Sequence, residues 1–434
     1  MQQSSLFLKY ILSFFPILKT LIEKINGKRN NELTYLHKDT SILRRVYSPD
    51  NKWEADTVDT SYVAADYVAV DSPVPLKSRD KISTASGKLP KMGMKKSLKE
   101  SEILQLRMME SQGGQVAEIR RKLAQDPVAC SVGIDERNEY ALLYGLSNGY
   151  VAVRDDDNPN ELLRIKYQYL PDNILGVADK DEGITVADLK NCIERAANDG
   201  NTIIKFWIGK SKFDALKKAQ DARELVANYR GQTYDSQTKL PVPTASAFQE
   251  AFLDETGVSF QIINRTVRLE HDGDKKSVKP WNNNMIIGVC SDMIGALVYG
   301  QVAEATNRVT GVTYQQIDYK LISQFSTTDP LKETTAVQAY CLPVIEDVDT
   351  IYQIDTTLSD PKVEVDKSAE ASDTNDVKVT IAGQAYKKPE AIKTLNGLGS
   401  TLASDASDKD VIDAYNALPP TKKKQFTDSA TKAE

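Results

Sequence analysis

Three glycines are the first candidates for chemistry, because glycines at suitable spacing can wrap a backbone loop around a phosphate. Gly288, Gly295 and Gly300 lie among apolar residues in the stretch 281–304, just after a polar turn. A phosphate loop needs glycines at fixed offsets, and the Walker pattern adds Lys and Ser or Thr after the last glycine. Here no G-x-G occurs, and glutamine and valine follow Gly300. The stretch therefore predicts a buried strand, with glycines that allow tight turns or close packing.

The side chains that most often perform acid–base or metal chemistry are scarce. Only two histidines occur, His37 and His271, each alone in a polar, loop-like setting. The cysteines are far apart and form no C-x-x-C pair, which predicts reduced, mostly buried thiols rather than a zinc or redox site. They are Cys130, Cys192, Cys290 and Cys341. We predict no catalytic residue, metal or cofactor, although a carboxylate-based enzyme stays open.

The composition is that of an ordinary globular protein. The chain has 434 residues, of which 41% are hydrophobic and 27% charged, and this predicts two or three domains with a substantial core. The net charge is −6. A protein that wraps duplex DNA tightly is usually basic, because neutralising phosphates supplies most of the affinity. We therefore expect that the chain as a whole does not bind nucleic acid strongly.

Residues 6–25 carry apolar side chains at helical spacing, interrupted by polar ones such as Lys9, Ser13 and Lys19. The pattern predicts one apolar helix face, and the lysines leave too short an uncharged run for a membrane-spanning helix. Pro16 predicts a kink. A signal peptide is not expected, because no positive leading region or small-residue cleavage site is present. We interpret this segment as an arm that docks on protein, with binding to a membrane surface as the alternative.

Residues 57–96 predict a second arm. Val, Tyr and Ala alternate with polar residues as far as Asp71, and a turn is expected at Ser86–Gly87. The resulting hairpin has little apolar surface to bury, and isolated hairpins are marginal in water. Such an arm needs a neighbour to lie on.

Helices are expected next along the chain. Ser97 with Glu100 reads as a capping box that opens a long helix, and Asp126–Pro127 is expected to end it. A second helix is expected to end at Gly149, with two strands joined by an Asp/Asn/Pro turn after it. A more compact region follows these elements in the sequence.

From residue 185 the pattern is that of a compact α/β region. Thr185 with Asp188 predicts a helix cap, Ser211 a second cap, and Asp272–Gly273 a turn after a strand. Residues 312–355 return to strands. The stretch 357–375 is acidic and poor in apolar residues, which predicts a linker. Residues 376–434 then predict a small module with one hairpin or strand and two or three helices.

Three stretches in this order carry a family resemblance. The first is Arg-x-Glu, an apolar helix, Leu-x-x-Gly and a strand; the second is a strand and a Gly-containing segment before Tyr-Gly; the third is Asp-Pro, a strand and Leu-Pro-Val. The matching residues are Arg137, Glu139, Leu146, Gly149, Gly295, Tyr299, Gly300, Asp329, Pro330, Leu342, Pro343 and Val344. Over residues 45–355 the sequence resembles the lambda-type major capsid protein E family of tailed bacteriophages.

The resemblance implies an α+β fold of the Hong Kong 97 capsid type, whose parts match the order of elements expected above. The parts are an N-terminal amphipathic arm (1–56), an extended loop or E-loop (57–96), a peripheral domain with a long spine helix (97–184), an axial domain (185–311), return strands of the peripheral domain (312–356), an acidic linker (357–375) and a C-terminal accessory module (376–434).

The resemblance also implies a function. The chain would be a structural protein of the virion that self-assembles in the bacterial cytoplasm into hexamers and pentamers of an icosahedral head. Portal, scaffolding and decoration or head-fibre proteins are the implied partners, and double-stranded DNA would be enclosed without specific binding. No membrane contact is implied. Two alternatives stay open: a membrane-associated protein anchored by residues 6–25, and an α/β enzyme.

Single residues keep alternative interpretations. Arg137 and Glu139 could pair across subunits, but a local pair or a solvent-facing position is the simpler expectation, and exposed pairs contribute little. Some capsid relatives crosslink a lysine to an asparagine. A solvated charge is the simpler expectation for the lysines here, because amine attack needs a desolvated lysine beside a carboxylate. The residues concerned are Lys77, Lys81, Lys88, Lys91, Lys95 and Lys96, with Asn282–Asn284 as ordinary turn residues.

Overall fold

The structure is a computed structural model with two compact units, Met1–Val363 and Glu364–Glu434. The residues that it describes are 35–58, 82–112, 116–154, 162–167, 169–181, 183–232, 240–271, 274–359, 378–381, 384–398 and 408–429. Residues 6–25, most of the E-loop and the acidic linker beyond residue 359 lie outside the described residues. Among the helices of the described part, none is long and apolar enough to cross a membrane.

The larger sheet of the first unit has six strands. Its order is β1 (Leu43–Ser48), β13 (Gly295–Gly300), β16 (Leu331–Ile345), β15 (Lys320–Thr328) and β14 (Thr313–Ile317), and β4 (Lys91–Lys99) also pairs with β16. Only the β1–β13 pair is parallel. The long strand β16 therefore joins β4, at the end of the E-loop range, to β13 and β15 in the same sheet.

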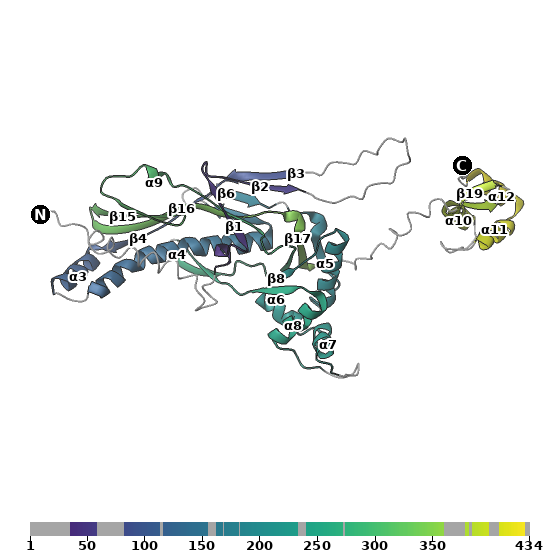
Figure 1. Ribbon diagram of the computed structural model, residues 1–434, viewed down its shortest axis with the longest axis horizontal. Coiled ribbons are helices and arrows are strands. Elements are labelled where there is room, and N and C mark those ends of the chain that lie inside the picture. The colour runs from purple at the N-terminus through teal and green to yellow at the C-terminus, as the bar shows by residue number, and fades with distance from the viewer. Residues whose placement is uncertain are drawn as a thin grey trace. The chain divides into compact units, whose positions relative to one another are not determined.

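A long helix lies along this sheet, as Figure 1 shows. It is α4 (Val116–Asn148), and its apolar side chains share one core with β13, β15 and β16. The expectation that the helix ends at Asp126–Pro127 is wrong, because Pro127 lies inside α4 and is buried. A proline costs a helix one backbone hydrogen bond, and burial of the helix against the sheet offsets that loss. The helix does end where expected, before Gly149, whose φ is +74°.

A shorter helix, α3 (Glu100–Ser111), precedes α4. The expected capping box is displaced: Lys99 occupies the N-cap position, and its backbone N–H donates to Glu102. Ser97 instead belongs to β4, where its hydroxyl bonds that of Thr334 on β16. The Ser-x-x-Glu pattern does not form the predicted cap, because pairing with β16 continues strand β4 as far as Lys99.

The smaller sheet has five strands. Its order is β7 (Ile174–Val177), β17 (Ile351–Ser359), β12 (Met285–Val289), β8 (Lys205–Gly209) and β9 (Ser259–Ile263). The helices that pack with it are α5 (Val186–Asn198), α6 (Lys210–Leu216), α7 (Gln220–Tyr229) and α8 (Ala245–Thr256), which gather beside this sheet in Figure 1. The predicted capping box of Thr185 and Asp188 is confirmed. Ser211 is not a cap, because α6 already begins at Lys210.

Three hairpins complete the larger unit. They are β2 (Lys52–Val58) with β3 (Ile82–Lys88), β5 (Tyr150–Arg154) with β6 (Leu162–Lys166), and β10 (Val267–His271) with β11 (Asp274–Val278). The turn expected at Ser86–Gly87 is wrong: both residues lie within β3, where Gly87 pairs with Trp53. The buried Trp53 ring explains the glycine, since a Cβ on Gly87 would lie 2.8 Å from the indole nitrogen.

The second unit is small and has its own core. It contains the hairpin β18 (Lys378–Ile381) and β19 (Gln384–Lys387) and the helices α10 (Lys388–Gly397), α11 (Asp408–Asn416) and α12 (Pro420–Ser429). Buried side chains from all three helices and both strands meet at Tyr386, Leu395, Val411 and Phe426. The hairpin and helices predicted for this region are therefore present.

Candidate functional site

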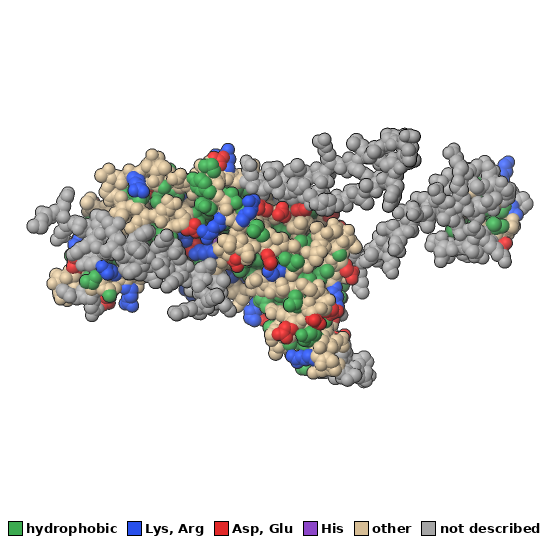
Figure 2. Space-filling model, viewed as in Figure 1, with side chains coloured by type: hydrophobic (Ala, Val, Ile, Leu, Met, Phe, Trp, Pro, Cys, Tyr) green, Lys and Arg blue, Asp and Glu red, His purple; other side chains and the backbone are tan. Residues whose placement is uncertain are grey.

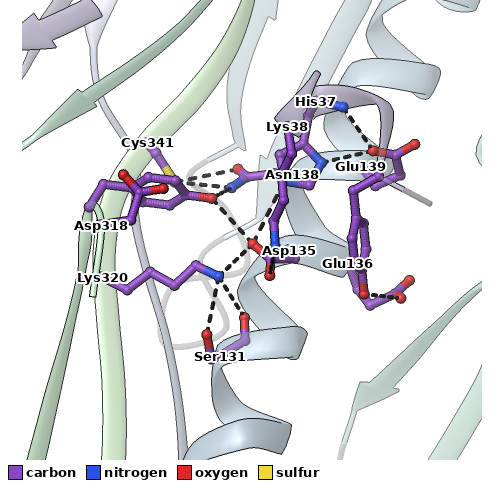
Figure 3. Close-up of polar contacts among 12 residues, drawn as sticks. His37, Lys38, Ser131, Asp135, Glu136, Asn138, Glu139, Asp318, Lys320 and Cys341 are labelled. Carbon is purple, nitrogen blue, oxygen red and sulfur yellow. Dashed lines mark hydrogen bonds and ion pairs between the residues drawn. The ribbon is translucent and has the colours of Figure 1, made fainter. Parts of the chain in front are cut away.

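The most concentrated group of buried charges lies at the middle of α4. Four polar residues on one side of that helix face the short 3-10 helix η2 (Leu36–Lys38) and the start of β15, as Figure 3 shows. Those helix residues are Ser131, Asp135, Asn138 and Glu139, and all are buried. We call them, with His37, Lys38 and Lys320, the α4 polar cluster.

Glu139 fixes the N-terminal segment to the helix. Its carboxylate accepts the backbone N–H groups of Leu36 and His37, each at 3.1 Å, and the Nδ1 atom of His37 lies 2.8 Å away. Glu139 is only 1% exposed. The expected local or solvent-facing pair with Arg137 is therefore wrong, and Arg137 instead stacks over the ring of Tyr140 at 5.7 Å. The expectation of a polar, loop-like setting for His37 is also wrong, since its side chain is fully buried.

Asp135 is the centre of the cluster. Its Oδ1 atom lies 2.5 Å from Nζ of Lys320, and its Oδ2 atom lies 2.7 Å from Nζ of Lys38. The Nε2 atom of His37 faces the same carboxylate at 3.7 Å. Burial by itself would raise the pKa of Asp135, but hydrogen bonding and the positive charges around it hold that pKa well below its usual range. The carboxylate thus stays ionised inside the protein.

Lys320 joins the cluster to the sheet. Its ammonium group donates to the carbonyl and hydroxyl oxygens of Ser131, both at 3.1 Å, as well as to Asp135. Burial lowers the pKa of Lys320, and the neighbouring Asp135 opposes that shift. Next to it, the side-chain amide of Asn138 donates to the hydroxyl of Tyr319 at 3.1 Å. Three segments far apart in sequence are therefore tied together by charged hydrogen bonds.

The geometry of the α4 polar cluster favours a structural role over chemistry. The His37 ring has no exposed surface, so no substrate atom can approach it. Burial raises the pKa of the Cys341 thiol to about 12, which leaves it neutral at ordinary pH. All four cysteines are free, and all but the half-buried Cys290 are buried, as predicted. No group of three metal-ligating side chains with suitable geometry occurs among the residues that the structure describes.

The glycines of the opening stretch serve packing. A Cβ on Gly295 would lie 2.0 Å from the backbone oxygen of Val344, and one on Gly300 would lie 1.8 Å from Oδ1 of Asn51. On Gly288 it would lie 3.0 Å from two buried apolar side chains. The prediction that these glycines belong to the fold is confirmed, because each sits where a neighbour occupies the space of a side chain.

The other motif residues lie at structural positions. Leu146 is fully buried in the core, and the ring of Tyr299 packs at a tilt against the rings of Tyr47 and Tyr319. Asp329 and Pro330 form the turn between β15 and β16, and the backbone oxygen of Pro343 accepts the hydroxyl of buried Tyr167 at 2.7 Å. The motif residues do not converge on one site. Glu139 is the one motif residue in the α4 polar cluster. Sequence reasoning missed its other members apart from His37, which are Lys38, Ser131, Asp135, Asn138 and Lys320.

The described lysines of the E-loop range are solvent-exposed, as expected for solvated charges. Lys88, Lys91, Lys95 and Lys96 are all exposed. Lys77 and Lys81 lie outside the described residues. The turn at Asn282 contacts the end of α4, because its backbone N–H donates to the hydroxyl of Ser147.

The low pKa of Asp135 makes a prediction about acid stability. A carboxyl whose pKa is depressed by folding contributes stability that is complete above the unfolded value, about 4 for Asp, and is lost as the pH falls below it. We therefore expect the free energy of unfolding to fall between pH 5 and pH 3 (roughly the window set by that reference value) more steeply in the natural chain than in Asp135→Asn. Denaturant unfolding followed by tryptophan fluorescence measures this. Equal acid slopes in both proteins would show that Asp135 is not the group responsible.

Comparisons with known proteins identify the class. A model of the phage major capsid protein E family matches residues 18–356. The chain is thus a structural capsid protein of tailed bacteriophages, whose copies form the icosahedral head of the virion. It belongs to the phage major capsid protein E family. Membership carries with it the α+β Hong Kong 97-type fold expected from the sequence, and a role that is not enzymatic.

Solved structures show more distant similarity. A prophage protein from Escherichia coli CFT073 has a TM-score of 0.48 at 13% identity, covering 78% of this chain and 98% of its own. A phage-related protein from Bordetella bronchiseptica RB50 has a TM-score of 0.42 at 10% identity, covering 79% and 96%. The capsid of cyanophage A-1(L) has a TM-score of 0.39 at 12% identity, covering 76% and 96%. Because these values are low, the assignment rests on the family model. No curated protein matches the sequence.

Proposed function

We propose that the larger unit divides into the peripheral and axial domains that the family resemblance implies. The six-stranded sheet with α4 would form the peripheral domain, and the five-stranded sheet with α5 to α8 the axial domain. Several strands depart from the sequence-based ranges: β7 and β17 join the smaller sheet, and β1, β4 and β13 join the larger one. The second apolar core, which one face of the smaller sheet forms with α5 to α8, supports the division, while side chains from the other face of that sheet, such as Trp207 and Ile287, pack in the first core.

Copies of the chain would associate into hexamers and pentamers, because heterologous contacts that close by rotation make rings. The observation that carries this proposal is the hairpin of β2 and β3. Among the described strands these two pair only with each other, so both outer edges lack a strand partner. Unpaired edges are ready to pair with another chain. A neighbouring copy in the shell supplies such a chain at each position.

Removal of the hairpin tip tests this proposal. Replacing residues 59–81 by a short Gly-Ser link should leave the two cores folded but prevent closed particles from forming, because the arm can no longer reach a neighbour. Negative-stain electron microscopy and sedimentation velocity measure the outcome, and tryptophan fluorescence checks the fold. Closed particles of normal size from this variant would contradict the proposal.

A truncation after Val363 is the matched control. It removes the whole second unit, which has its own core. This unit would be an exposed accessory module joined to the rest through the acidic stretch 357–375, so particles should still form without it. The remaining contacts, with portal, scaffolding and decoration or head-fibre proteins, would be made by the assembled shell.

The packaged double-stranded DNA would be enclosed without specific binding. The net charge of the chain is −6. Figure 2 shows acidic and basic side chains interspersed among the described residues on the face in view. Non-specific DNA affinity grows with the number of phosphates that a protein neutralises. A wall of this composition would let DNA move during packaging.

A further inference from the structure

Helix α3 carries two large apolar side chains that are mostly exposed in the described part of the chain. Leu104 and Met108 are each 62% exposed. They are four residues apart, so they lie next to each other on one helix face. The opposite face is in the core through Ile103 and Leu106. Single exposed apolar residues are normal, but two adjacent ones form a patch that is suited to a partner.

The polar residues around this patch set the charge of its partner. Glu100 and Glu102 open α3 and are exposed. Arg107, the only basic residue of the helix, is half-buried and forms an ion pair with Glu110 at 3.6 Å. Lys99 is exposed at the N-cap, so this end of the helix carries two acidic groups and one basic group. The exposed face is therefore mainly apolar with a mildly acidic end, and it fits an apolar segment that carries a few lysines.

The chain has such a segment at residues 6–25. Its apolar side chains recur at helical spacing, and Lys9, Lys19 and Lys24 lie between them. We propose that residues 6–25 dock in cis on the Leu104–Met108 face of α3. This proposal rests on the proposed function in one respect: it takes residues 6–25 to be part of a subunit of the shell.

The length of the chain allows this contact. The described chain begins at Tyr35, whose hydroxyl donates to Glu136 on α4 at 2.8 Å. From Glu136 back to Val116 at the start of α4 the distance is roughly 30 Å at the rise of an α-helix. Residues 26–34 can span roughly 30 Å when extended. Residues 6–25 can therefore reach α3 from Tyr35, where the α4 polar cluster holds the chain on the same subunit.

Thiol labelling of Met108→Cys in the full chain tests the proposal. The labelling rate is read by peptide mass spectrometry on unassembled protein, checked by sedimentation velocity. A second substitution, Phe14→Lys, breaks the apolar face of residues 6–25 and should accelerate labelling about tenfold or more, since burying a large apolar side chain is worth at least that factor. The matched control Ser13→Lys places the same charge on the polar side and should leave the rate unchanged. Leu253→Cys on α8, 47% exposed, should label at one rate in all backgrounds.

Each other outcome overturns the proposal. If Met108→Cys labels as fast as Leu253→Cys in the chain with natural residues 6–25, nothing covers the face. If it is protected only at high concentration, a second copy covers the face instead. If Ser13→Lys accelerates labelling as much as Phe14→Lys, the apolar face is not the contact. The measurement does not need particles, so a failure of assembly would be seen separately.

Discussion

Gly295→Ala is expected to destabilise the larger unit by at least about 3 kcal/mol, at the upper end of what overpacking costs. The added methyl group would lie 2.0 Å from the backbone oxygen of Val344 and 3.0 Å from the Cα atom of Ile345. Both are main-chain atoms of β16, and β13 is held on its other side by β1. The methyl group can be accommodated only by separating two paired strands in the middle of the sheet.

Gly93→Ala is the matched control for this prediction. It also lies in a strand paired with β16, but the nearest atom to its added methyl group is 3.6 Å away. Its effect should be within about 0.5 kcal/mol, as for ordinary surface substitutions. Tryptophan fluorescence measures only the larger unit, because all three tryptophans, Trp53, Trp207 and Trp281, lie in its core. Similar unfolding midpoints for the two variants would show that the sheet does not require Gly295.

Asp135→Asn is expected to cost about 3–5 kcal/mol at neutral pH, because removing one partner from a buried ion pair leaves a charge uncompensated. Lys320, only 3% exposed, would keep the two oxygens of Ser131 and at most one neutral amide oxygen, with no negative charge beside it. Lys38 and His37 would lose the same carboxylate. Residues 35–38 would then be held to α4 by Glu139 and by the hydrogen bond of Tyr35 to Glu136, so their attachment should loosen as well.

Asp318→Asn gives the comparison for an exposed carboxylate. Asp318 pairs with Arg45 at 2.8 Å, and both side chains are more than a third exposed. Its loss should cost less than about 1 kcal/mol, the usual range for surface pairs. Denaturant unfolding followed by tryptophan fluorescence measures the free energy of unfolding of both variants. If Asp135→Asn is no more destabilised than Asp318→Asn, the α4 polar cluster does not stabilise the fold.

Local patterns in the sequence predict many of the elements. Thr185 with Asp188, the stop at Gly149 and the buried strand that contains Gly288 are all found as expected. Each depends on residues close together in the chain. Ser97 and Pro127 fail for the opposite reason, since long-range packing of β4 on β16 and of α4 on the sheet overrides the local signal.

The α4 polar cluster could not be predicted in the same way. Asp135 and Lys320 meet across 185 positions of sequence, and His37 joins them from the N-terminal segment. One signal was available: Asp135 and Glu139 are four residues apart in an apolar helix, which places two carboxylates on one face. That spacing indicates a buried partner but does not identify it. Only the fold shows which lysine and which histidine supply the compensating charge.

Purification of the full chain followed by sedimentation velocity at rising concentration tests the capsid assignment most directly. The account predicts rings or closed particles, visible by negative-stain electron microscopy, that appear as concentration increases. A single compact monomer at every concentration, with the hairpin of β2 and β3 folded onto its own body, would contradict it.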